Sequence, residues 1–457
     1  MIYLINLIKK NKLKTFLIFA VIFFLFFFSL WNVVSGGYDK QNKAIIFLKK
    51  FIPTKIARHV RDTVFIIPNL KERNRYLELI MRKYDQGLDG EIFNEEIVLS
   101  ESKKNKYLLR EFFIPFHRLD LRLGWASTKN ATKKHYLDIL EDNILVISGN
   151  GRSIYFDKNN IFNNKLKQKE IPNNIKNILE QENSELMGIR DLYIEDNKAY
   201  ISLYFKNEKG YSMNIYCAEF NTKRLNFNLF FEAKEFWKDW TTRTGGRIEK
   251  YKDNEILLSL GDGAIKNSSQ NTNSILGKII SINKISKKHK IVSLGHRNPQ
   301  GLAYVEDLNL IMNTEHGPKG GDEININFLK SNAVPNYGWD ISSYGTEYDG
   351  SDPYKKSHKD FGFVEPFKDY TPAIGISEIL YIKDSSSNKK NIFVSSLRAS
   401  SIYILEIDDK FKKIIKEDRL FFPEQRIRDM KYDKKNNIIL LLFDPIPSIG
   451  VLRLEKK

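Results

Sequence analysis

Cysteine is almost absent from the sequence, which has one such residue, Cys217, in 457 positions. A single thiol excludes an internal disulfide framework and any metal site built from several cysteines. Cys217 stands in a run where apolar and polar residues alternate, as they do in a half-buried strand. We therefore expect a buried and chemically inert thiol at this position.

A concentrated basic segment is also missing, although the formal net charge is +17. The lysines are scattered along the chain, and no basic helix with interleaved aromatic residues appears. This distribution argues against a nucleic-acid partner, which needs clustered cations. A positive charge of this size suits an anionic lipid surface or another polyanion. We attribute it chiefly to the Lys-, Asn- and Ile-rich composition, which is typical of AT-rich genomes.

Charged residues are absent from positions 15–38, which form an apolar run rich in Phe, Leu and Ile. A run of roughly twenty apolar residues spans a bilayer core. Four lysines within positions 9–14 precede it and predict a cytoplasmic N-terminus. We expect residues 1–38 to form a cytoplasmic tip and an uncleaved single-pass anchor in the inner membrane, with the remainder in the periplasm. A cleaved signal peptide, cut near residues 35–37, is the alternative.

Residues 39–106 are expected to form a helical stalk or linker. Apolar residues recur at helical spacing between positions 70 and 84. Pro68 stands near the start of this segment, and Gly87 and Gly90 follow its end. Two roles are open for it. It is either a membrane-surface or self-association stalk, which makes a homodimer possible, or a spacer packed on the next domain.

Residues 107–457 have the sequence pattern of β-strands joined by polar turns. Six times, a turn rich in Asp, Asn or Lys leads into an apolar strand, a polar hairpin and a second strand. Such repeated units are typical of propeller blades, so we predict an all-β, six-bladed β-propeller. A strand at about 108–116 is expected to complete the last blade and close the ring. The six apolar strands lie at 143–148, 198–204, 254–260, 308–313, 391–395 and 437–443.

The segment 295–339 concentrates polar and glycine residues that are costly to a fold unless they have a function. It contains RNPQG at 297–301, EHGPKGGDE at 315–323 and NYGW at 336–339. Its glycines allow the backbone to turn carbonyl groups toward one point. Acidic side chains beside such carbonyls suit calcium, which takes about six to eight oxygen ligands.

These three motifs resemble the signature of the soluble PQQ-dependent glucose and aldose sugar dehydrogenases, the glucose/sorbosone dehydrogenase family. The resemblance covers about residues 130–457. It implies a propeller that transfers hydride from a sugar to PQQ, with calcium as a second cofactor.

The resemblance also implies a PQQ site built on basic residues. In the family, the basic residue of a Ser-Leu-Lys/Arg motif and the two arginines of an RxRD motif meet the cofactor, and their counterparts here are Arg398, Arg426 and Arg428. Guanidinium groups match carboxylates in bidentate geometry and stay protonated. The alternative for the last two is a pair of solvated charges on one strand face. The full implied set is Arg297, Asn298, Gln300, Arg398, Arg426, Arg428 and Asp444.

Two calcium sites follow from the same resemblance. The family uses the carbonyl groups of a Gly-Pro pair for the ion that bridges PQQ, and these are Gly317 and Pro318 here. A second, structural ion uses an acid, the tyrosine carbonyl of NYGW and a downstream acid. The corresponding residues are Glu323, Tyr337 and Glu347.

The position of the family's general base departs from the pattern. The sequence TGGRI at 244–248 resembles the family's HxGGRL, in which a histidine four residues before the arginine takes the proton. That position is Arg243 here, and a guanidinium with a pKa above about 12 cannot act as a base near neutral pH. No histidine lies between His135 and His289. No catalytic residue is therefore assigned, and His316 is expected to line the pocket.

Two interpretations of the site stay open. The chain is either an active dehydrogenase in which another group replaces the histidine, or a catalytically inactive propeller that binds a sugar or a carboxylated ligand. A third class, a propeller hydrolase of the lactonase type, is disfavoured because the RNPQG and RxRD motifs have no role in it.

Overall fold

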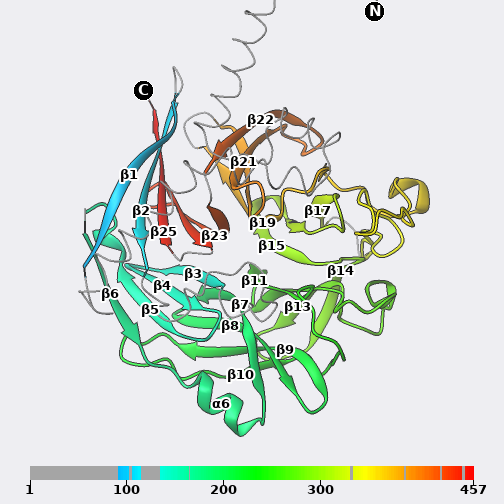
Figure 1. The fold of residues 1–457 in the computed structure, drawn as a ribbon, viewed down its shortest axis with the longest axis horizontal. Coiled ribbons are helices and arrows are strands. Elements are labelled where there is room, and N and C mark those ends of the chain that lie inside the picture. The colour runs from blue at the N-terminus through cyan, green and yellow to red at the C-terminus, as the bar shows by residue number, and fades with distance from the viewer. Residues whose placement is uncertain are drawn as a thin grey trace, which may run out of the picture. The chain divides into compact units, whose positions relative to one another are not determined.

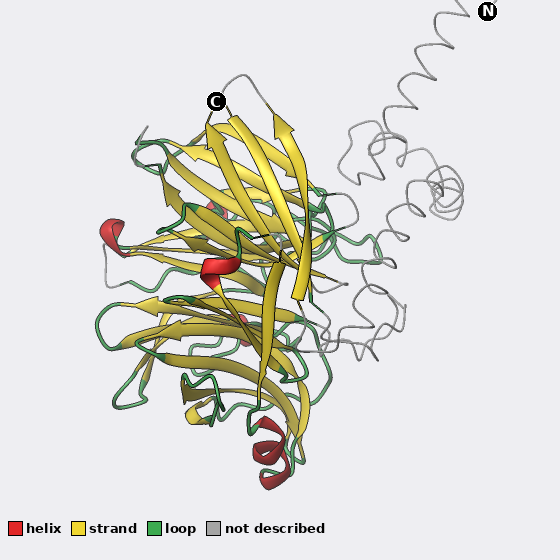
Figure 2. Ribbon diagram, turned by 90° about the vertical axis from the view of Figure 1, so that its left-hand side faces the viewer, coloured by secondary structure: helices red, strands yellow, loops and turns green. Residues whose placement is uncertain are grey.

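The chain folds into six blades of antiparallel strands arranged around a centre (Figure 1). Four blades are separate four-stranded sheets, and the other two share one nine-stranded sheet. Most of the described chain is strand or loop, and its α-helix is α6 (Ile175–Gln181) (Figure 2). The prediction of an all-β, six-bladed propeller is confirmed. The computed structural model describes residues 91–101, 105–114, 134–163, 165–329, 333–384, 388–422, 425–444 and 448–456.

The first three blades follow one another along the chain, each from its inner strand outward. Blade 1 contains β3 (His135–Leu140), β4 (Asn143–Ser148), β5 (Ser153–Asp157) and β6 (Lys165–Ile171). Blade 2 contains β7 (Glu185–Glu195), β8 (Lys198–Asn207), β9 (Gly210–Glu219) and β10 (Asn228–Glu232). Blade 3 contains β11 (Gly245–Tyr251), β12 (Glu255–Leu260), β13 (Lys278–Asn283) and β14 (His289–Leu294).

The other three blades complete the ring. Blade 4 contains β15 (Pro299–Val305), β16 (Leu310–Glu315), β17 (Asp322–Phe328) and β18 (Lys368–Tyr370). Blade 5 contains β19 (Ile376–Lys383), β20 (Lys390–Ser396), β21 (Ser401–Ile407) and β22 (Ile414–Phe421). Blade 6 contains β23 (Arg426–Asp433), β24 (Ile438–Asp444), β25 (Ser448–Lys456) and β2 (Asn105–Phe113). Short 3₁₀ turns occur at Lys158–Asn160, Ser268–Gln270, Glu306–Leu308 and Lys359–Phe361.

The second strand of each blade is one of the six apolar runs found in the sequence. All seven residues of β24 are buried, as are five of the six in β12. These strands are apolar on both faces because each blade packs between two neighbours. The described core accordingly consists of six hydrophobic clusters, one between each pair of adjacent blades.

The ring is closed by strands from before the first blade. As predicted, the segment after residue 105 supplies the last strand of blade 6, because β2 pairs with β25 along its whole length. An additional strand, β1 (Glu91–Glu101), pairs with β2 and then, through Glu91–Phe93, with β6 of blade 1. The sheet therefore begins at Glu91, inside the range for which a helical linker was expected. Pairing with two open sheet edges explains this strand better than its own apolar pattern does.

The predicted membrane anchor at 15–38 and the predicted helix at 70–84 lie outside the described residues. Within the described ranges, no helix is long and apolar enough to cross a bilayer.

Candidate functional site

The inner strands of the six blades line the centre of the ring, and Arg247 fills that centre. Its guanidinium lies 2.7 Å from Asp191 of β7, 2.9 Å from Asp429 of β23 and 3.0 Å from Glu378 of β19. These atoms are almost completely buried. One arginine on β11 therefore ties three other inner strands together.

The Arg247 side chain also donates hydrogen bonds to two backbone carbonyl groups. These contacts show which residues of neighbouring inner strands lie at the same height in the channel. Its Nε donates to the carbonyl oxygen of Gln300, and its Nη2 donates to that of Arg428. Arg247 is the third residue of β11, Gln300 the second of β15, and Arg428 the third of β23. The first residues of these strands thus lie together at one end of the channel, which we call the channel mouth.

A cavity of about 360 Å³ opens at the channel mouth. This volume falls at the lower end of the range of about 300–1,000 Å³ that is usual for small-molecule sites. Residues of the RNPQG and EHGP motifs line it together with Arg243 and Arg398, so the structure brings together motifs that are far apart in the sequence. The lining residues are Thr242, Arg243, Arg297, Asn298, His316, Gly317, Pro318, Lys319, Gly320, Asp322, Tyr348, Ala373, Gly375 and Arg398.

Arg297 is buried at the wall of this cavity. Its Nη1 donates to the carbonyl oxygens of Gly317 at 2.8 Å and His316 at 3.1 Å, and its guanidinium lies over the Trp339 ring. Burial and the neighbouring Arg243 lower the pKa of Arg297. The carbonyl expected to bind calcium is therefore bound by a guanidinium, which leaves its second lone pair for a cation.

Arg243, at the general-base position, is held by an acid. Its Nε lies 3.2 Å from Asp262, whose other oxygen accepts the indole N–H of Trp339 at 2.7 Å. Asp262 is buried, and burial raises its pKa. Because Arg243 is cationic and paired with an acid, it can bind an anion but cannot accept a proton.

His316 is the imidazole at the wall of the cavity. Its Nδ1 lies 3.7 Å from Asp322, on the next strand of the same blade. The Asp322 carboxylate also accepts the backbone N–H groups of Gly375 at 2.7 Å and Ile376 at 3.0 Å. These contacts fix Asp322 in place, so the imidazole faces a positioned carboxylate.

The side chains of Asn298 and Gln300 make hydrogen bonds within the protein at the channel mouth. The Asn298 side-chain oxygen accepts the backbone N–H of Gly245 and the Gln300 amide N–H. Gln300 also donates to the carbonyl oxygen of Pro299. Asn298 thus links blade 4 to the Gly-Gly-Arg turn of blade 3.

The basic residues of blades 5 and 6 lie at the same end of the channel. Arg428 is buried and pairs with Asp444 at 2.9 Å. Arg426 is half-buried and lies directly opposite Asp444 in the strand register. Burial and the adjacent Arg428 lower the pKa of Arg426 to about 10. Arg398 is exposed, and it donates to the carbonyl oxygen of Ala373 at the cavity wall.

A sequence model of the glucose/sorbosone dehydrogenase family matches residues 136–445. The match runs from the first inner strand to the end of β24 and includes every motif discussed above. The chain belongs to the glucose/sorbosone dehydrogenase family.

Two curated relatives match part of this family member. An uncharacterised protein from Synechocystis is 28% identical over 281 residues, which are 56% of this chain and 66% of that protein. An aldose sugar dehydrogenase from Escherichia coli is 27% identical over 206 residues, which are 41% of this chain and 53% of that protein. The match thus spans 66% and 53% of the relatives' own lengths.

Two solved structures share the fold of this chain. The apo form of a soluble aldose sugar dehydrogenase from Escherichia coli has a TM-score of 0.57 at 20% identity, covering 70% of this chain and 96% of that one. The holo PQQ domain of a pyranose dehydrogenase from Coprinopsis cinerea has a TM-score of 0.52 at 10% identity, covering 70% and 93%. Identities this low establish the propeller alone.

The second calcium site expected for the family contains an imidazole. The Nδ1 of His358 lies 3.0 Å from the Tyr337 carbonyl oxygen, and its Nε2 lies 3.5 Å from the Glu323 carboxylate. The ring therefore lies between the two groups where a cation was expected. Glu347 accepts a hydrogen bond from Tyr354 instead. Among the described residues, no cluster of three or more acidic, histidine or cysteine side chains has metal-binding geometry.

Sequence reasoning assigned no role to Arg190 and Arg247, two of the deeply buried arginines of the described channel. Arg247 was part of a recognised motif, and Asp191 and Asp429 gave no sign that they would meet it across the channel. Arg190 stands in β7 without any motif. The available signal was the rarity of arginine in an inner strand that is otherwise buried.

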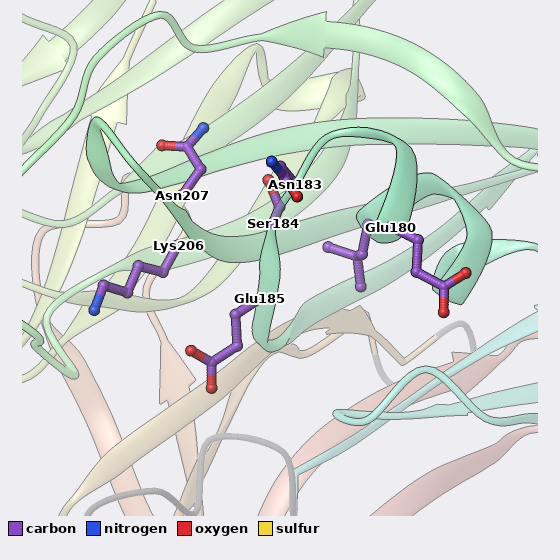
Figure 3. A pocket seen from close by; sticks show the side chains of 7 residues that line it. Glu180, Asn183, Ser184, Glu185, Lys206 and Asn207 are labelled. Carbon is purple, nitrogen blue, oxygen red and sulfur yellow. The ribbon is translucent and has the colours of Figure 1, made fainter.

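A separate hollow of about 340 Å³ lies beside α6 (Figure 3). Glu180, Glu185 and Lys206 surround it, and Glu185 lies opposite Lys206 in the strand register. Because its charges are of both signs and exposed, we assign no ligand to it.

Proposed function

We propose that this family member oxidises an aldose or a related sugar and passes the hydride to PQQ bound at the channel mouth. The observation that carries the proposal is that Arg297 and Arg398 line the cavity at the channel mouth. Arg426 and Arg428 do not line it, but they are the first and third residues of β23 and so lie at the same end of the channel. The propeller that carries these residues has the same fold as an aldose sugar dehydrogenase and as the PQQ domain of a pyranose dehydrogenase.

The donor set fits the cofactor. PQQ is a tricarboxylate with an ortho-quinone, and when bound it supplies the two-electron acceptor. Guanidinium groups bind carboxylates in bidentate geometry. The Nε of buried Arg297 has no hydrogen-bond partner within the described structure, as expected of a group that awaits an acceptor. Arg398, Arg426 and Arg428 would hold carboxylates, and Asn298 would keep the adjoining turn in place.

The residues at the cavity wall also limit where a proton can go. Arg243 cannot accept one, and Asp322 is already bonded to backbone N–H groups. His316 is left as the proton acceptor from a substrate hydroxyl, through the ring nitrogen that faces away from Asp322. Asp322 would position the ring, as a carboxylate does for an imidazole in many active sites.

In this chain, few protein groups are available to bind the calcium expected at Gly317 and Pro318. Backbone carbonyls are available there, but that of Gly317 is shared with Arg297, and the described residues contain no group of three or more acidic, histidine or cysteine side chains that could hold a metal. A cation at this position would therefore take most of its remaining ligands from the bound cofactor.

We also propose that the propeller is anchored in the inner membrane and faces the periplasm. The support is the uncharged run at 15–38 and the four lysines before it. A fusion of residues 1–38 to an enzyme that is active only after export tests this. Activity in the membrane fraction is expected, and activity confined to the cytoplasm would overturn the proposal.

The activity test uses the full chain supplied with PQQ and calcium. Dye reduction with a panel of aldoses is expected, and His316→Gln should lower kcat by about 100-fold or more, as loss of a general base does. Arg224→Met, at an exposed residue away from the channel, is the control. Bound PQQ without dye reduction by any aldose would overturn the enzymatic proposal, and unchanged kcat in His316→Gln would overturn the role of His316.

A further inference from the structure

Arg190 is a buried cation without a hydrogen-bond partner. Its side chain is 2% exposed, and none of its three guanidinium nitrogens has an acceptor among the described residues. Its contact is with the Tyr204 ring, whose centroid lies 4.8 Å from the guanidinium carbon. Buried guanidinium groups are normally paired, because an unpaired buried charge loses its hydration without compensation.

The backbone around Arg190 is arranged to hold its side chain at the channel. Arg190 is the extra residue of a β-bulge, since Ile189 pairs with Leu203 and Asp191 with Ser202. Bulges are frequent next to functional sites, where they redirect a side chain. Gly246 of the neighbouring inner strand has φ +113°, and a Cβ there would lie 2.4 Å from the Arg190 Cβ. A glycine at 246 therefore allows residue 190 to carry a side chain.

The charge of a second arginine acts on Arg190. Burial, and after it the charge of Arg428, lower the pKa of Arg190. Burial, and after it the charges of Arg190, Arg428 and Arg426, also lower the pKa of Lys134, which directly precedes β3, well below its usual range. The carboxylate that acts on Lys134 is Asp444, and it is already paired with Arg428. We call Lys134, Arg190, Arg426 and Arg428 the basic wall.

The acid next to Arg190 in the chain is not available to it. Asp191 binds Arg247 at 2.7 Å and the backbone N–H of Ile248 at 2.7 Å. Arg190 is therefore a buried guanidinium without a carboxylate partner among the described residues, and the charge of Arg428 on β23 also acts on it. Cations partly removed from water in this way favour a negatively charged group.

We propose that Arg190, with Lys134 and Arg426, binds an oxyanion, either a carboxylate or a phosphate, of the ligand at the channel mouth. None of the recognised motifs contains Arg190 or Lys134, so these two residues extend the site that the motifs imply, to which Arg426 already belongs. The inference rests on the proposed function in one respect, namely that the ligand enters at this mouth. The oxyanion has two possible carriers, PQQ itself or an acidic sugar substrate.

The test compares the full chain with Arg190→Met, and with Arg224→Met as an exposed control. Without ligand, Arg190→Met should raise Tm by about 2–4 °C, because it removes an unpaired buried charge and keeps the length of the side chain. The same variant should lose about 10-fold or more in affinity for the oxyanion probe, as expected when a charged hydrogen bond is removed. The probes are PQQ, glucuronate and inorganic phosphate, measured by calorimetry.

The probes separate the two carriers. Weaker PQQ binding by Arg190→Met identifies a cofactor carboxylate, whereas unchanged PQQ binding with weaker glucuronate or phosphate binding identifies an acidic substrate. If wild type binds no PQQ but binds glucuronate or phosphate through Arg190, the oxyanion site stands and the proposed cofactor fails.

A structural role for Arg190 gives a different pattern. Lower Tm without ligand together with unchanged affinity for all three probes would overturn the proposal. Lys134→Met provides a second route, because Met keeps the length and apolar stem of the side chain and removes its charge. Unchanged binding of all probes by Lys134→Met and Arg190→Met would also overturn the proposal.

Discussion

Arg247 and Arg190 lie on neighbouring inner strands, and both are almost completely buried. Arg247 meets three acidic side chains, those of Asp191, Glu378 and Asp429. Arg190 meets a tyrosine ring and has no hydrogen-bond acceptor within the described residues. Two buried arginines of one channel therefore have different environments, since Arg247 is paired with acids and Arg190 is not.

The difference indicates which charges serve the fold and which serve a ligand. A buried charge that is fully paired holds the blades together, and removing it leaves its partners uncompensated. A buried charge without a partner destabilises the empty protein and is retained where it contributes to binding. The channel centre around Arg247 is of the first kind, and the basic wall around Arg190 is of the second.

The largest expected effect comes from Arg247→Met. This change leaves Asp191 and Asp429 buried without their cation and Glu378 without its hydrogen-bond donor, so we expect a loss of about 3–5 kcal/mol in the free energy of unfolding. Denaturant unfolding followed by circular dichroism measures it. An unfolding free energy equal to that of wild type would show that the buried acids do not need Arg247.

A smaller effect concerns pH. Burial raises the pKa of Glu378 to about 8, above the value of about 4.3 in an unfolded chain. Between these values the folded protein holds a proton that the unfolded chain has lost, so stability is full below about pH 4 and falls as pH rises towards 8. Glu378→Gln should reduce this slope by up to about 1.4 kcal/mol per pH unit.

Unfolding free energies measured from pH 5 to pH 8 test the prediction for Glu378. Glu185→Gln, at an exposed glutamate, is the matched control and should leave the slope unchanged. A slope in Glu378→Gln identical to that of wild type would contradict the assignment. Asp191, whose pKa burial raises to about 6, contributes in the same direction in both proteins.

The smallest expected effect is that of calcium removal. Because the His358 ring lies between Glu323 and the Tyr337 carbonyl, the ligand-free chain should show the same Tm with and without a chelator. His358→Asp places a second carboxylate beside Glu323, so this variant should gain a calcium-dependent rise in Tm. A lower Tm of wild type in the chelator would instead indicate a bound structural ion.

The fold could be predicted well from the sequence because its strongest signal is local. The second strand of each blade is buried on both faces. A run of consecutive apolar residues, as in β24, is enough to predict such a strand. Strand β1 was missed, because it forms by pairing with two sheet edges and not by a burial pattern of its own. Edge pairing depends on segments that are distant in the chain.

The candidate site could be predicted in part. Arg297, Asn298, Gly317, Pro318 and Arg398 do line one cavity, as the motifs implied. The partners of these residues could not be predicted, because contacts such as those of His358 with Tyr337 and Glu323 arise from the folding of the long segment between β17 and β18. The environment of Arg190 likewise depends on three blades.

The most direct test of this account is the free energy of unfolding of Arg190→Met and Arg247→Met, measured side by side without ligand. Both variants replace a buried guanidinium by the same apolar side chain, so their difference reports the pairing alone. The account predicts opposite signs, with Arg190→Met more stable than wild type and Arg247→Met less stable. Destabilisation of both variants by similar amounts would contradict it.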